Sequence, residues 1–102
     1  MYTHSKISLS EIRTMILCEF PLSTEEIGHQ YYDGEGVNKS LKEAYVWYRI
    51  AQCAGNNNVD SLVNYLNTGM ITATRLRLSS RAKHIYIRAL RHEGKDSPLL
   101  CL

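Results

Sequence analysis

The chain of 102 residues is predicted to be a single all-α domain, and three observations support this prediction. Helix-start motifs recur in front of apolar segments, and apolar residues repeat at three- and four-residue spacing. No segment alternates apolar and polar residues for the length of a β-strand. With 44% hydrophobic and 22% charged residues, the composition is typical of a soluble globular protein with one small core.

Three capping motifs predict the first three helices. In each motif a serine hydroxyl and the carboxylate of a glutamate three residues later can cap each other's backbone amides. The pairs are Ser8 with Glu11, Ser23 with Glu26, and Ser40 with Glu43. They predict helices over residues 7–20, 23–33 and 40–54, which end at Pro21, Gly34 and Gly55.

Two further helices are predicted in the second half of the chain. Asn56-Asn57-Asn58 form a polar linker, and its last members can cap a helix that carries Val59, Leu62, Val63 and Leu66 and ends near Gly69. Thr72 or Thr74 then opens the longest helix, which continues to about His92. The tail over 95–102 contains Leu99, Leu100 and Leu102, which match no helical pattern.

Charge is distributed unevenly along a chain whose net charge is only +2. Residues 1–66 contain five Lys or Arg and eight Asp or Glu, whereas residues 67–102 contain seven and two. The three cysteines, Cys18, Cys53 and Cys101, are far apart and predict neither a disulfide framework nor a zinc site. No signal peptide or membrane-spanning segment is recognised, so we expect a cytoplasmic protein that does not bind membranes.

Small residues and glycines between residues 27 and 55 follow the pattern of two short helices in contact. The residues concerned are Ile27-Gly28, Tyr31, Gly34-Glu35-Gly36-Val37, Ala44, Trp47-Tyr48, Ala51 and Gly55. This pattern closely resembles the Sel-one-like repeat, a relative of the tetratricopeptide repeat. The resemblance implies a right-handed α-α solenoid of about five helices, and it implies that the protein binds other proteins.

A second, weaker copy of the pattern follows the first. Val63 lies 36 residues after Ile27, and Ala82 lies 38 residues after Ala44, which are periods typical of helical repeats. Asn64 replaces the glycine found at Gly28, so this copy is divergent. We therefore expect one domain with an N-terminal capping helix over 7–20, a clear repeat over 23–55, a divergent terminal repeat over 58–93 and a tail over 95–102.

The resemblance also suggests where a partner would bind. In tetratricopeptide-like solenoids the first helices of successive repeats line a concave face. The corresponding positions here are Glu25, His29, Tyr32, Asp33, Ser61 and Tyr65. Aromatic and charged groups suit selective protein contacts, although the same positions are also compatible with a merely solvated surface. The breadth of the family allows a bacterial accessory or immunity-type protein, and a second copy of the chain is an alternative partner.

A basic stripe offers a different interpretation. Arg77, Arg81, His84, Arg88 and Arg91 recur at spacings of four and three residues along the last predicted helix. Such a stripe suits an acidic partner or nucleic acid, but it also suits the polar outer face of a terminal repeat. It contains no aromatic side chains that would stack on bases, which disfavours nucleic acid.

The sequence contains no motif for catalysis, and we expect no enzyme activity and no cofactor. His29 and Asp33 are four residues apart and could share a metal ion or a proton, but no further ligand is evident. Gly34-Glu35-Gly36 follows a predicted helix rather than a strand, so it lacks the context of a dinucleotide-binding loop.

Overall fold

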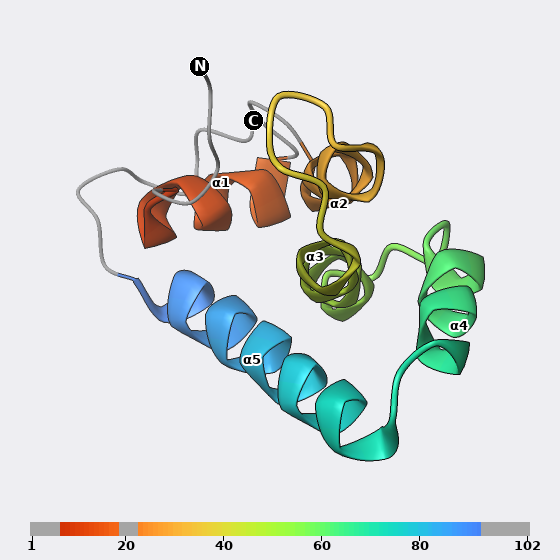
Figure 1. Cartoon of the computed structure of the whole chain (residues 1–102). Helices are drawn as coiled ribbons and strands as arrows, with labels where there is room; N and C mark the ends of the chain where they lie inside the picture. Colours follow the sequence, from red (N-terminus) through yellow and green to blue (C-terminus); the bar gives the residue numbers. More distant parts are fainter. Residues whose placement is uncertain (1–6, 19–22, 93–102) are drawn as a thin grey trace.

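The computed structural model describes residues 7–18 and 23–92. These residues form five helices joined by short loops, and the described part of the chain contains no strand (Figure 1). The helices are α1 (Leu9–Cys18), α2 (Thr24–Asp33), α3 (Leu41–Cys53), α4 (Asp60–Thr68) and α5 (Thr72–Arg91). The predicted all-α class is therefore confirmed.

The predicted capping motifs account for the starts of the first three helices. Ser8 and Glu11 cap each other's backbone amides, as do Ser23 and Glu26, at donor–acceptor distances of 3.0 and 3.1 Å. The third motif forms only in part. The Ser40 hydroxyl accepts from the Glu43 amide at 3.1 Å, while the carboxylate of Glu43 pairs with Arg81.

The last two helices begin without a side-chain cap. Val59 and Ile71 occupy the N-cap positions of α4 and α5, and neither helix start has a side-chain cap hydrogen bond. The prediction that Asn58 caps α4 is wrong. Instead, the backbone amide of Asn58 donates to the side-chain oxygen of Asn56 at 2.8 Å, which shapes the preceding loop.

α3 is the central helix of the fold. It packs most extensively on α2, then on α5, and more lightly on α4 (Figure 1). Seven of its thirteen residues are buried, which is why its sequence is almost continuously apolar: Ala44, Tyr45, Val46, Trp47, Tyr48, Ile50 and Ala51. The predicted core face of this helix is thus correct.

The α2–α3 hairpin is close because Gly28 faces the ring of Tyr48. A Cβ atom at position 28 would lie 2.5 Å from Cε1 of Tyr48, a distance that no real side chain can keep. Gly34 then ends α2 with φ = 76°, in the left-handed region that glycine tolerates best. These two glycines have the structural roles that the sequence pattern predicts.

α5 and α1 complete the core on the other side of α3. α5 packs along α3, where the Tyr45 hydroxyl lies 3.1 Å from that of Ser79, and α1 packs on α5. The Arg13 guanidinium donates a hydrogen bond to the backbone carbonyl of Leu90, which joins α1 to the last turn of α5.

α4 and α5 leave their connecting turn in different directions and do not pack along each other in the described chain (Figure 1). α4 is attached mainly to α3, in part through a hydrogen bond from the Gln52 side-chain amide to Asp60. The second helix pair is therefore open, whereas the α2–α3 pair is a closed hairpin. The assignment of residues 58–93 to a divergent second repeat therefore stays a prediction.

Two sequence predictions concern cysteines and the C-terminal tail. Cys53 has a free, exposed thiol. Cys18 is disulfide-bonded, although the sequence predicted no disulfide framework. Cys101 and the tail over 95–102 lie outside the described residues.

Candidate functional site

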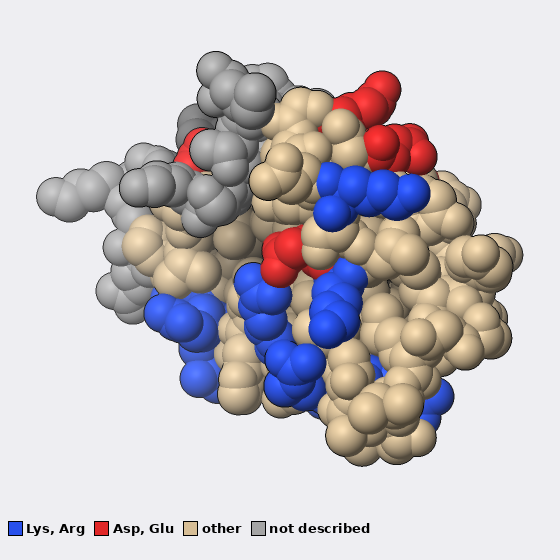
Figure 2. Space-filling view, in the orientation of Figure 1, with Lys and Arg blue, Asp and Glu red and all other residues tan. Residues whose placement is uncertain are grey.

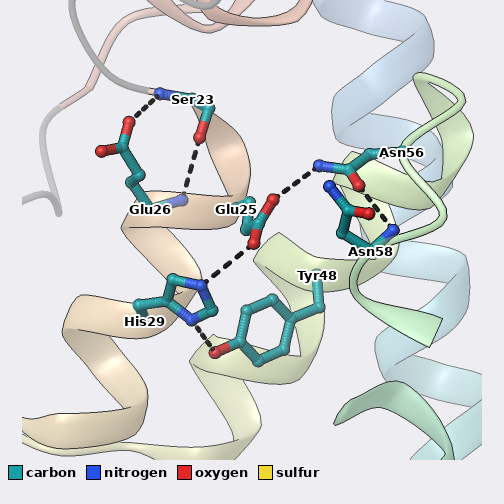
Figure 3. Close-up of polar contacts among 7 residues, drawn as sticks. All are labelled: Ser23, Glu25, Glu26, His29, Tyr48, Asn56 and Asn58. Atoms are coloured by element: carbon teal, nitrogen blue, oxygen red, sulfur yellow. Dashed lines mark hydrogen bonds and ion pairs between the residues drawn. The ribbon is translucent and has the colours of Figure 1, made fainter. Parts of the chain in front are cut away.

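A chain of hydrogen bonds links side chains of α2 to α3 and to the loop that follows α3 (Figure 3). The Tyr48 hydroxyl lies 2.7 Å from His29 Nδ1, and His29 Nε2 lies 3.1 Å from Glu25 Oε2. The other oxygen of Glu25 accepts from the Asn56 side-chain amide at 2.8 Å. Three separate segments therefore fix the orientation of the Glu25 carboxylate and the His29 ring.

Tyr48 is the buried end of this chain. Its side chain is fully buried, and burial together with the nearby negative charges of Asp33 and Glu25 raises its pKa well above the ordinary value. The phenol is therefore protonated at neutral pH and can donate to His29 Nδ1, which leaves His29 Nε2 to donate to Glu25. The Tyr48 hydroxyl therefore links the buried side of α3 to the partly exposed His29 ring of α2.

Four of the predicted partner-binding residues gather on α2 around this phenol. His29 contacts the Tyr48 ring edge-on, with ring centroids 5.4 Å apart, and Tyr32 is tilted against it at 6.5 Å. Asp33 is exposed at the end of the helix. The side chains of His29 and Glu25 are 42% and 25% exposed, so both remain accessible from solvent although they are hydrogen-bonded.

The other two predicted residues lie on a different helix. Ser61 and Tyr65 are exposed on α4, and the Tyr65 side chain is 63% exposed. α2 and α4 both contact α3, but within the described chain no hydrogen bond joins α4 to the α2 face. We call Glu25, His29, Tyr32 and Asp33 the α2 face and treat it as the candidate site.

A cavity of about 450 Å³ adjoins the α2 face near the start of α2. Glu25 and Asn56 line it on one side, and Met15 of α1 lines it on the other. A second cavity of about 440 Å³ lies between α1, α3 and α5, with Trp47 in its wall and the Glu43–Arg81 ion pair beside it. Both cavities are formed by residues that also hold the helices together.

The residues of the predicted basic stripe are all exposed in the structure: Arg77, Arg81, His84, Arg88 and Arg91. Several Lys and Arg side chains lie over α5, with other residues between them (Figure 2). Arg81 is tied to α3 by its ion pair with Glu43, whose charged atoms are 2.6 Å apart. α5 itself contains no acidic residue.

Sequence analysis missed two members of the hydrogen-bond chain. The sequence places Tyr48 in the pattern of two helices in contact, and its buried ring agrees with that; the pattern does not predict that its hydroxyl also orients His29. Asn56 was assigned to a polar linker, and nothing in its local sequence indicates that it reaches Glu25. The suggested pairing of His29 with Asp33 does not form; His29 bonds to Glu25 on the preceding turn instead.

Searches of protein-family models, curated proteins and solved structures find no match to the chain. Within the described residues, no three histidine, cysteine or acidic side chains are grouped closely enough to hold a metal ion. None of the five described helices combines the length and apolar character needed to cross a membrane.

Proposed function

We propose that this protein is a non-catalytic helical binding module that holds a protein partner against its α2 face. The observation that carries the proposal is the hydrogen-bond chain from Tyr48 through His29 to Glu25 and Asn56. It fixes polar side chains that are still open to solvent, so little side-chain entropy is lost when a partner binds.

The chemistry of the face supports a protein partner rather than a reaction. Tyr32 offers aromatic area at the surface, and Asp33 and Glu25 supply negative charge beside it. Tyrosine is enriched among residues that dominate binding energies, while neighbouring charges reject unsuitable partners. The resemblance to Sel-one-like repeats supports the same conclusion, and it extends the proposed face to Ser61 and Tyr65 of α4.

The test compares two double variants in affinity capture from native extract, followed by binding measurements with the purified partner. Tyr32→Ala with Asp33→Ala removes the open side chains of the α2 face. Glu35→Ala with Lys39→Ala removes two exposed side chains of the following loop and is the matched control. We expect the first pair to weaken binding about 30-fold, as the loss of an interface hot spot does, and the control to change it little.

Circular dichroism must show equal helicity for both variants before binding is compared. If the same partner is retained equally by the wild type and the Tyr32→Ala, Asp33→Ala variant, the α2 face is not the binding site.

A further inference from the structure

The outward side of α5 carries a feature that the α2 face does not explain. The helix contains six Lys or Arg residues and no acidic residue over its 20 positions. Its buried side is formed by Leu78, Ala82 and Ala89, which pack towards the core. The opposite side is exposed from Ala73 to His84, is half-buried at Ile87 and Leu90, and has a sequence pattern of its own.

That pattern has the spacing of a heptad repeat, and three of its six positions carry large apolar side chains. Ala73, Ser80 and Ile87 are seven residues apart, and Leu76, Lys83 and Leu90 each follow one of them by three residues. In a coiled coil, the residues at these two positions of each heptad form the contact line along which a second helix packs, and we call the six residues here the seam. Leu76 is 61% exposed, and Ala73 and Ser80 are exposed small residues that allow close approach of another helix. Ile87 and Leu90 are half-buried.

Basic side chains flank this seam on one side. Three basic residues lie four positions after Ala73, Ser80 and Ile87, respectively: Arg77, His84 and Arg91. At this heptad position charged residues select the partner of a coiled coil. All three are exposed, and the described carboxylates form no ion pair with Arg77 or Arg91. Figure 2 shows several Lys and Arg side chains over α5 on one face of the molecule.

We propose that the outward side of α5 binds an acidic amphipathic helix of another protein. Leucines of such a helix would pack on Leu76 and the small residues beside it, and its glutamates would pair with Arg77, His84 and Arg91. A second copy of α5 is a poor occupant, because it would place arginines against arginines. This surface is separate from the α2 face and does not depend on its function.

Nucleic acid is less well matched to this surface than an acidic helix. Phosphates would pair with the arginines but would gain nothing from the exposed side chain of Leu76. No aromatic residue lies among the seam or its basic flank, so bases would have no ring on which to stack. An amphipathic helix uses both the apolar and the cationic parts of the surface.

The test uses a synthetic peptide of about three heptads with leucine at the seam positions and glutamate beside them. A peptide of the same composition in scrambled order separates packing from charge, and duplex DNA tests for a polyanion site. We expect the heptad peptide to bind the wild type about tenfold more tightly than the scrambled one. Equal binding of the two peptides, or no binding of either, overturns the proposal.

Two matched pairs of exposed substitutions locate the site. Arg77→Glu should weaken binding of the heptad peptide about tenfold, while Lys39→Glu, the same charge reversal in the α2–α3 loop, should have little effect. Leu76→Ser should also weaken it, whereas Leu41→Ser, at another exposed leucine, should not. If Arg77→Glu weakens binding of DNA and peptide equally and Leu76→Ser changes neither, α5 is a general polyanion site and the proposal is wrong.

Discussion

At the scale of single residues, Tyr48 couples the core to the α2 face. Its ring fills the space that Gly28 leaves open, and its hydroxyl orients His29. Any substitution that moves this ring therefore changes both the distance between α2 and α3 and the geometry of the candidate site. The same residue makes the stability of the protein depend on pH.

We predict that Tyr48 destabilises the folded state at high pH. Because its pKa is raised in the folded protein, the unfolded chain loses this proton first, at about pH 10, and unfolding is then favoured. The contribution of Tyr48 is thus fully present below about pH 10 and declines by up to ~1.4 kcal/mol per pH unit above it. Urea unfolding between about pH 7 and pH 11 measures this dependence.

The control for this prediction is a comparison of two hydroxyl deletions. Tyr48→Phe should cost about 1 kcal/mol at neutral pH, through the lost hydrogen bond to His29, and should flatten the alkaline decline. Tyr65→Phe removes a hydroxyl from an exposed ring and should leave the decline unchanged. An alkaline decline that is the same in wild type and Tyr48→Phe would contradict the role given to Tyr48.

The candidate site could be predicted only in part at this scale. The four residues of the α2 face share one side of a helix, which follows from their spacing. Glu25 and Asp33 are both four residues from His29, so the sequence offers two equivalent partners. The structure selects Glu25 as the partner of His29, because the Tyr48 hydroxyl orients the His29 ring and the Asn56 amide holds the Glu25 carboxylate. Both groups come from other segments of the chain.

At the scale of helices, local sequence determines where the elements begin and end. Helix bounds were predicted to within one or two residues for α2 to α5, because caps and glycine stops act over a few neighbouring residues. The cap predicted for α4 does not form, because the backbone amide of Asn58 bonds to the Asn56 side chain within the loop and α4 begins without a side-chain cap. The missing cap of α5 provides a test.

We predict that Ile71→Ser stabilises the protein. Ile71 is the N-cap residue of α5 and is 72% exposed, so its side chain contributes little packing. A serine hydroxyl there can accept a hydrogen bond from a free backbone amide of the first turn, which contributes about 0.5–1 kcal/mol. Thermal unfolding should show an increase in Tm of about 2–8 °C.

Ile71→Val is the matched control for this substitution, since it shortens the side chain without adding a hydrogen-bond acceptor. It should leave Tm nearly unchanged. If the serine and valine variants unfold at the same temperature, the first turn of α5 does not lack a cap.

At the scale of the whole molecule, α3 holds α2, α4 and α5 in place, while α1 packs on α5 and α2. The all-α class and the α2–α3 contact could be predicted, because both follow from patterns within a short segment. The open arrangement of α4 and α5 could not be predicted, because the spacing of their apolar residues is equally compatible with two helices packed as a hairpin. The positions of α4 and α5 depend on how both helices, together with α2, pack on α3. These contacts involve side chains that are distant in the sequence.

We predict that hydrogen exchange is uneven among the helices. α3 is buried on most of its surface, whereas α4 is short, has no side-chain cap and is attached mainly to α3. Amides in the middle of α3 should exchange at least about tenfold more slowly than those of α4, which can open locally. Equal protection of the two helices in residue-resolved exchange would show that α4 unfolds only together with the core.

The bond between Arg13 and Leu90 closes a loop of 77 residues. Closing so long a loop early in folding is entropically unfavourable, whereas α2 and α3 need only a short turn to meet. We therefore expect α1 to dock late, after α5 has reached α3. During synthesis on the ribosome, Ile12 and Met15 would stay exposed until α5 emerges, and this interval is when the nascent chain is most vulnerable to aggregation.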